Sequence, residues 1–264
     1  MKKVAPFLVT TALLLTACGQ PAKTVEPTPM PTSTLKSAGV SLTYEDNAQV
    51  ELVTPAGRHI YIDVYNTSQL TKDPSADDIL LTTHLHNDHY YPAFVDTFPG
   101  QQILDSTGKI ELPDVTITGL ASAHNVSDPF LDKGGTDYIF IIDTGGLRIV
   151  HFGDIGQEAL TDEQLTAIGS VDVAITQFSN SYSNMNVNNL KGFNLMNQVK
   201  PRLIIPTHSD SATIKIAVER WAGYYSDSPM VTLSSSALPA DKSILFLGNM
   251  AVAYGTIYNL KPWK

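Results

Sequence analysis

The chain has 264 residues, enough for one large domain or two small ones, and its 43% hydrophobic and 16% charged residues suit a globular core. Its 17 basic and 26 acidic residues give a net charge of −9. This balance argues against a partner such as a nucleic-acid backbone, which needs a basic face, but leaves open a small anionic substrate held at a metal.

The N-terminus has the layout of an export signal. Lys2 and Lys3 precede an almost wholly apolar stretch over residues 4–15, which is short for a membrane span. The next residues, up to Ala17-Cys18, resemble the bacterial lipobox, in which the Cys is acylated after cleavage. We therefore expect a lipoprotein signal peptide over residues 1–17, a lipid on Cys18, and an exported protein that this lipid anchors in the membrane of the bacterial cell envelope.

A linker follows the signal. Residues 18–39 are rich in Pro, Thr and Ser, a composition that predicts an extended, disordered spacer. From residue 40 the pattern changes, and we expect a single domain over residues 40–264. Cys18 is the only cysteine, so the stability of this domain must come from its core or from bound metal.

Short strands and helices are predicted throughout the domain. Apolar and alternating runs predict strands at 41–44, 50–54, 60–65, 79–83, 138–143, 147–152, 171–176, 203–206, 230–233 and 244–254. Helices are expected to begin in a capping box at Thr161, to end before Pro201, and to span residues 211–225. Strands first, then strand–helix alternation, then strands again indicate an α/β domain.

The segment that decides the chemistry is Thr83-His84-Leu85-His86-Asn87-Asp88-His89, directly after a predicted buried strand. His84 and His86 are two positions apart, so both can turn to one side of an extended chain. Imidazole and carboxylate groups are suitable ligands for zinc and its neighbours. A polar loop that happens to be rich in His is the alternative, but the chain has only 7 His and three of them fall here.

This local cluster cannot fill the coordination shells of two metal ions, so more ligands must come from later segments. His124, Asp154 and His208 each follow a predicted strand or an apolar run. Ligands in α/β sheets collect at the carboxyl ends of strands. Each residue alone is often an ordinary loop residue with a hydrogen bond, but together with the first cluster they predict a metal site.

This pattern resembles the metallo-β-lactamase superfamily from about residue 41 to about residue 254. The resemblance is carried by His-x-His-x-Asp-His, His124, Gly153-Asp154 and His208, and Asp63 matches that family's early Asp. Residues 136–154 and 199–208 are similar to the branch of ascorbate-6-phosphate lactonase-like and N-acylethanolamine phospholipase D-like proteins. The resemblance implies a four-layer αββα sandwich with mixed sheets and the metals at one edge.

The resemblance also implies a role for each residue. The first metal would be bound by His84, His86 and His124, the second by Asp88, His89 and His208, with Asp154 as the bridge. Asp88 would also be catalytic, because it would orient the attacking water. Two divalent ions, Zn²⁺ or else Mn²⁺, Fe²⁺ or nickel, would activate this water to cleave a lactone, amide or phosphodiester bond in a small molecule.

Other functions of this superfamily fit less well. Flavodiiron oxidoreductases place Glu at the position of His86, and antibiotic-cleaving enzymes use a Cys ligand where this chain has Asp154. A nuclease would require a basic groove. The branch usually has Gly-His where Asp46-Asn47 stand, so a non-catalytic metal- or ligand-binding surface lipoprotein remains the alternative.

A few residues near the predicted site are weaker candidates. Asn125, Tyr90, Asn180 and Tyr182 lie near it in sequence and could contact substrate, although each is more often a simple loop residue. His151 alternates with an apolar strand residue, which indicates a structural role.

Overall fold

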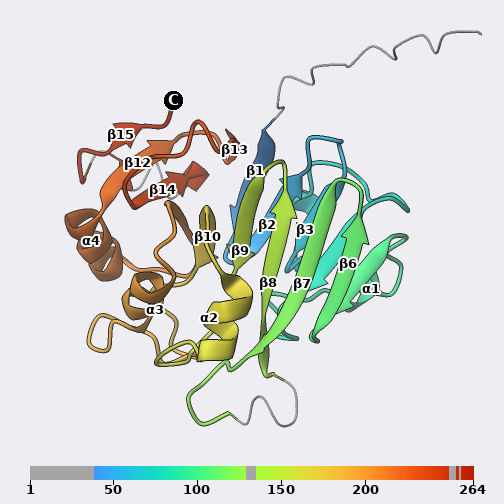
Figure 1. Cartoon of the computed structure of the whole chain (residues 1–264), viewed down its shortest axis with the longest axis horizontal. Helices are drawn as coiled ribbons and strands as arrows, with labels where there is room; N and C mark the ends of the chain where they lie inside the picture. Colours follow the sequence, from blue (N-terminus) through green and yellow to red (C-terminus); the bar gives the residue numbers. More distant parts are fainter. Residues whose placement is uncertain (1–38, 129–134, 250–253, 256) are drawn as a thin grey trace, which may run out of the picture. The chain divides into compact units, whose positions relative to one another are not determined.

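The computed structural model describes residues 39–128, 135–249, 254–255 and 257–264 (Figure 1). The predicted signal peptide, Cys18 and the linker up to residue 38 lie outside the described residues. The strands form two sheets. The first sheet has the order β13 (Met230–Leu233), β1 (Val40–Asp46), β2 (Gln49–Val53), β3 (His59–Ile62), β4 (Ile79–Thr82) and β5 (Gln101–Leu104). The second has the order β15 (Lys261–Pro262), β12 (Ala222–Ser226), β14 (Ser243–Leu247), β11 (Leu203–Pro206), β10 (Val173–Thr176), β9 (Leu147–His151), β8 (Asp137–Thr144), β7 (Val115–Ser122) and β6 (Gly108–Leu112).

Both sheets mix parallel and antiparallel pairs. β1, β2 and β3 pair antiparallel, whereas β3, β4 and β5 are parallel. In the second sheet β6 to β9 pair antiparallel, whereas β9, β10, β11, β14 and β12 are parallel. The helices are α1 (Pro92–Val95), α2 (Asp162–Ile168), α3 (Lys191–Val199) and α4 (Ser211–Arg220), with a 3-10 turn η1 (Thr67–Gln69). None of the described helices has the length and hydropathy needed to cross a bilayer.

Successive side chains of a strand point to opposite faces of its sheet, and this alternation divides the core into layers. In β8, Phe140 and Ile142 pack between the two sheets, while Ile139 and Ile141 face the opposite side, where they join residues of α2, α3 and α4. In β3 and β4, Tyr61 and Leu80 face away from the other sheet and pack with residues of and beside α1. The layers therefore run helix, sheet, sheet, helix, and Figure 1 shows α2 and α3 beside the second sheet. The predicted αββα sandwich with mixed sheets is confirmed.

Local sequence rules explain where several elements begin and end. The Thr161 hydroxyl accepts a hydrogen bond from the Gln164 backbone, and the Gln164 side chain accepts one from the Thr161 backbone, so α2 begins in the predicted capping box. β10 and β11 are buried on both faces, as their unbroken apolar sequences require for central parallel strands.

Three element predictions were wrong or incomplete. The helix expected over 211–225 ends at Arg220, because Ala222–Ser226 form strand β12 and pair in parallel with β14. The strand expected over 244–254 ends at Leu247, before Gly248 with a φ of +54°, and residues 250–253 of that prediction lie outside the described residues. Strands β5, β6 and β7 were not predicted. β5 and β6 are short polar runs that gain strand structure by pairing with neighbours, whereas the alternation along Val115–Ser122 does carry a strand signal that the prediction overlooked.

Candidate metal centre

Strand direction explains why distant segments meet at one edge. β7 and β9 run in the same direction because each pairs antiparallel with β8, and β10 and β11 continue that direction in parallel. The carboxyl ends of β7, β9 and β11 therefore share an edge of the second sheet. His124 follows β7, Asp154 follows β9 and His208 follows β11, while the segment from His84 to His89 follows β4 of the first sheet.

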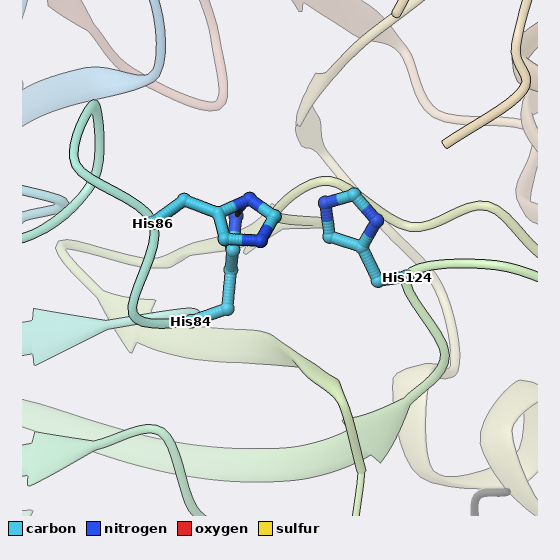
Figure 2. A group of neighbouring side chains, drawn as sticks. All are labelled: His84, His86 and His124. Atoms are coloured by element: carbon cyan, nitrogen blue, oxygen red, sulfur yellow. Dashed lines mark hydrogen bonds between the residues drawn. The ribbon is translucent and has the colours of Figure 1, made fainter. Parts of the chain in front are cut away.

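The first group of donors consists of His84, His86 and His124 (Figure 2). One nitrogen from each lies within 4.8 Å of the others. Nε2 of His84 is 3.1 Å from Nδ1 of His86, and the rings of His86 and His124 have centroids 4.8 Å apart. Donors around a tetrahedral zinc at about 2.1 Å lie about 3.4 Å from one another, so these imidazoles are spaced to share one ion.

The second group consists of Asp88, His89 and His208, whose donor atoms also lie within 4.8 Å of one another. Nε2 of His208 is 3.5 Å from Nε2 of His89, and Oδ2 of Asp88 is 4.0 Å from both nitrogens. His89 is fully buried, whereas Asp88 is half-exposed. This group therefore has a buried side and a side open to solvent.

Asp154 lies between the two groups. Its Oδ2 is 3.7 Å from Nε2 of His124 and 3.4 Å from Nε2 of His89, and its Oδ1 is 3.5 Å from Nε2 of His208. The structure thus brings together all seven of the residues that the sequence selects. We call them the ligand cluster: His84, His86, Asp88, His89, His124, Asp154 and His208.

Two atoms of the ligand cluster indicate that it fits a cation. Nε2 of His124 and Oδ1 of Asp154 are buried and have no hydrogen-bond partner among the described residues. Buried polar atoms are normally satisfied, and a metal ion would satisfy both. Five imidazoles and two carboxylates are donors suited to zinc, iron or manganese, so the residues fit divalent ions.

Asp63 holds His89 from behind. Its Oδ2 is 2.9 Å from Nδ1 of His89, and its carboxylate also accepts hydrogen bonds from the backbone and hydroxyl of Thr83, at 2.7 Å and 2.8 Å. This arrangement turns Nε2 of His89 toward Asp154. Carboxylates that accept from the other ring nitrogen orient ligating histidines in this way.

Asp137 is a second supporting carboxylate, and the sequence did not single it out. It is fully buried, accepts hydrogen bonds from the Ser122 hydroxyl at 2.7 Å and the Asp154 backbone at 3.0 Å, and lies 3.4 Å from Nδ1 of His84. Gly153 has a φ of +55°, and a Cβ there would lie 2.3 Å from Oδ1 of Asp137. Gly153 is therefore required for Asp137 and Asp154 to approach each other.

Electrostatics favour a ligating form at several members of the ligand cluster. Burial alone would raise the pKa of Asp154, but His124 and His89 outweigh it and hold this pKa well below the usual range. Burial lowers the pKa of His86 and of His208, which keeps these imidazoles neutral near neutral pH. Burial would also lower the pKa of His89, but Asp63 and Asp154 hold it well above the usual value. Metal binding would therefore displace a proton from His89.

Two cavities open onto the ligand cluster. The first cavity, of about 570 Å³, is lined by His86, His124, Asp105, Asp128 and Tyr182, among others. The second cavity, of about 580 Å³, is lined by Tyr65, Leu85, His86, Asn87, Asp88, Asp154 and Tyr182. Tyr65, Asp105 and Asp128 were not selected from the sequence, because ordinary loop positions carry no signal of what they face.

The weaker candidates have different positions. Tyr182 and Asn125 line the first cavity, and Nδ2 of Asn180 donates to Asp154 at 2.6 Å. Tyr90 instead packs against the apolar cluster beside α1, away from the cavities. His151 is fully buried and accepts a hydrogen bond from the Gly153 backbone, in keeping with a structural role.

Asn47, the departure from the branch pattern, lies in the turn between β1 and β2. It has a φ of +45°, a conformation that Asn tolerates better than most residues. Its backbone N–H donates to the Asp46 carboxylate. Asn47 does not line either of the two cavities, whereas Tyr65, which donates to Asp46, lines the second.

Comparison with known families finds that the Beta-lactamase superfamily domain matches residues 41–208. Among solved structures, a Thermotoga maritima protein described as a Zn-dependent hydrolase of the metallo-beta-lactamase superfamily is 18% identical with a TM-score of 0.58, over 79% of this chain and 98% of that one. A protein of Parabacteroides distasonis described as a metal-dependent hydrolase is 18% identical with a TM-score of 0.51, over 68% and 87%.

A third structure, the metallo-beta-lactamase fold protein YhfI from Bacillus subtilis, is 11% identical with a TM-score of 0.52, over 80% of this chain and 97% of that one. At such identities these likenesses show a shared fold. A search of curated proteins finds no match to this sequence.

Proposed function

Since the chain belongs to the Beta-lactamase superfamily, we propose that it is a hydrolase whose ligand cluster binds two divalent metal ions and cleaves a lactone, amide or phosphodiester bond. The observation that carries this proposal is the pairing of two three-donor groups with Asp154 between them. A purely structural zinc site is normally closed by four ligands. Seven donors, five of which line two cavities, are instead the arrangement expected of a catalytic centre.

The metal ions would supply activation of a water molecule and stabilisation of the negative charge that develops on the substrate. Zn²⁺ is the ion that the histidine-rich donor set suits best, with Mn²⁺ or Fe²⁺ as alternatives. His84, His86 and His124 would hold the first ion, and Asp88, His89 and His208 the second. Asp154 would contact both.

The residues of the chain then have distinct tasks. Asp88 lines the second cavity and its half-exposed carboxylate can accept a proton from the attacking water and orient it. Asp63 would keep the remaining proton of a metal-bound His89 on Nδ1, so that Nε2 can ligate. No Ser, Cys or Lys nucleophile is needed for this chemistry.

We further propose where the hydrolase works and on what. The sequence of residues 1–17 and Cys18 supports export and a lipid anchor at the bacterial cell envelope. The net charge of −9 supports a small-molecule substrate rather than a nucleic acid. Membrane partition of the full-length protein, lost in a Cys18→Ser variant, tests the anchor.

The experiment that tests the hydrolase is elemental analysis of the purified protein, joined to a hydrolysis screen. Lactone, amide and phosphodiester substrates are compared before and after chelation, and again after the metal is restored. We expect two metal equivalents and a turnover that chelation removes. Bound metal without turnover across the whole panel would favour a metal- or ligand-binding lipoprotein instead.

A further inference from the structure

Negative charge dominates the entrance to the ligand cluster. The first cavity is lined by the carboxylates of Asp105 and Asp128, and the second by those of Asp88 and Asp154. No Lys or Arg lines either cavity among the residues that the structure describes. A site built for a phosphate or a carboxylate normally offers such a cation.

The two acidic residues of the first cavity are positioned by hydrogen bonds, Asp128 through its side chain and Asp105 through its backbone. The carboxylate of Asp128 accepts hydrogen bonds from the Asn125 backbone at 2.8 Å and from the Thr136 hydroxyl at 2.7 Å. The backbone of Asp105 donates to Thr82 at 2.8 Å, which fixes this residue beside the end of β4. The Asp128 carboxylate therefore cannot turn away from a ligand without the loss of these two contacts, and the backbone position of Asp105 keeps its carboxylate in the cavity wall.

The charges remain unbalanced when metal is included. Six carboxylates lie in the ligand cluster, directly behind it or in the cavity walls: Asp63, Asp88, Asp105, Asp128, Asp137 and Asp154. Two divalent cations would neutralise four of these negative charges, so the neighbourhood keeps a formal negative charge. A cavity lined by one sign of charge attracts ligands of the opposite sign and repels those of the same sign.

Two exposed side chains, one aromatic and one apolar, are shared by the two cavities. Tyr182 is 75% exposed and Leu85 is 51% exposed, and both line both cavities. The Tyr182 ring centroid is 6.2 Å from that of His86, so a ligand held at the first donor group passes beside this ring. Aromatic faces bind apolar groups and attract cations.

From these observations we propose that the site selects substrates whose group beside the scissile bond is cationic or uncharged, and that it discriminates against anionic groups. The inference rests on the proposed function and narrows it, because the negative charge of the cavity walls also favours a neutral lactone or amide over an anionic phosphodiester. The cationic or apolar group would lie in the first cavity, between Tyr182 and the carboxylates of Asp105 and Asp128.

Binding of three matched probes to the zinc-loaded protein tests the proposal without the need for turnover. Each probe is a benzohydroxamate, which anchors on metal, with trimethylammonium, methyl or sulfonate at the para position. Calorimetry at low ionic strength is expected to show the sulfonate at least about tenfold weaker than the trimethylammonium probe, with methyl between them or equal to the latter. The difference should shrink at high salt.

Two charge-neutralising variants locate the effect. Asp105→Asn is expected to reduce the ratio of trimethylammonium-probe affinity to sulfonate-probe affinity several-fold. Glu219→Gln, which removes one exposed charge on α4, should leave this ratio unchanged. If Asp105→Asn fails to fold, the order of the three probes on the unmodified protein still decides the proposal.

The outcomes separate this inference from the proposed function. Sulfonate binding that equals or exceeds trimethylammonium binding would overturn the charge selection, even if hydrolysis is found. The expected order without hydrolysis of any lactone, amide or phosphodiester would refute the hydrolase and leave the charge selection standing. No binding of any probe would remove the metal site and both proposals with it.

Discussion

Asp63 shows how much depends on single residues around the ligand cluster. It directly follows β3 and has a φ of +53°, and its carboxylate accepts hydrogen bonds from Thr83 and contacts His89. Asp and Asn tolerate this left-handed conformation better than most residues, and only Asp offers an acceptor to both partners. Asp63, which matches the early Asp of the family, is therefore explained by its role in orienting His89, and this role needs no contact with metal.

His86 gives the most direct prediction at this scale. Its nitrogen is one of three in the first donor group, so His86→Ala is expected to lose at least one metal equivalent and all measurable hydrolysis. Elemental analysis and the hydrolysis screen provide the measurements. His59→Asn is the matched control, because His59 pairs with Glu51 outside the ligand cluster and its replacement should retain both metals. Two metal equivalents and full activity in His86→Ala would refute the site.

The environment of Glu45 is expected to make the stability of the folded domain depend on pH. Burial, opposed by a hydrogen bond from Gln49 and reinforced by the Glu51 carboxylate, raises the pKa of Glu45 to about 8 from its usual 4.5. A group whose pKa is higher in the folded protein stabilises it fully below the unfolded value and loses that contribution as pH rises. The melting temperature is therefore expected to fall by several degrees between about pH 5 and pH 8.5.

Glu45→Gln isolates this contribution, because Gln cannot ionise and remains able to contact Gln49. Its melting temperature should change less than that of the unmodified protein over the same pH range, as measured by calorimetry at constant salt. Glu51, His59 and Tyr61 face the same side of the sheet and remain in both proteins. Equal slopes in the two proteins would show that Glu45 does not carry the effect.

At the scale of elements, the sequence predicts the strands that are buried on both faces. β10, β11 and the centre of β8 are almost wholly apolar runs, which require a sheet covered on both sides. β12 could not be predicted, because Ala222–Ser226 becomes a strand only through pairing with β14, a contact that local periodicity does not contain. Tertiary pairing overrides local preference in such a strand.

The same distinction applies to the site. Each member of the ligand cluster follows a strand and belongs to a short motif, so all seven residues could be named from the sequence. Asp137 opens β8 just before an apolar run, and its role arises from Ser122 on the paired strand and from the Asp154 backbone. Contacts of this kind join distant segments and leave no local signal.

Lys191, at the start of α3, connects this helix to the backbone around the metal centre. Its ammonium is fully buried and donates to the carbonyl oxygens of Gly156 at 3.0 Å and Ser183 at 3.4 Å. The Ser183 hydroxyl donates to the Asp154 carbonyl, and the Gly156 backbone donates to Ala123, next to His124. Lys191 thus fixes the backbone around two ligands from different strands.

Lys191→Met keeps the length of the side chain and leaves both carbonyl oxygens without a donor. We expect metal affinity to fall about tenfold or more, in addition to a lower melting temperature. Competition with a chromogenic chelator measures the affinity. Lys215→Met, at an exposed position of α4, is the control and should change neither quantity. A lower melting temperature with unchanged metal affinity would limit Lys191 to a structural role.

At the scale of the whole domain, the ligand cluster joins the two sheets. The segment from His84 to His89 belongs to the first sheet, and His124, Asp154 and His208 follow strands of the second. A metal shared by both groups would bind the folded domain and not the unfolded chain. Its free energy of binding would then add to the free energy of unfolding.

Chelation is therefore expected to lower the melting temperature. A ligand at a hundred times its Kd adds about 2.7 kcal/mol, which corresponds to roughly 5–10 °C for a domain of this size. Scanning calorimetry before chelation, after it and after re-addition of Zn²⁺ gives the measurement. The His86→Ala protein should show a smaller decrease. A melting temperature that does not respond to chelation in the unmodified protein would contradict the coupling between metal and fold.

The wide separation of the donors along the chain has a consequence for biosynthesis. Translation makes the His84–His89 segment early and His208 only after β11 has been made. A nascent chain thus offers three imidazoles and a carboxylate to any ion it meets, long before its second donor group can be completed. If the ligand cluster binds metal as proposed, correct metallation would have to wait until the chain has been made as far as His208, and a fragment that stops short of His208 would be incompletely metallated.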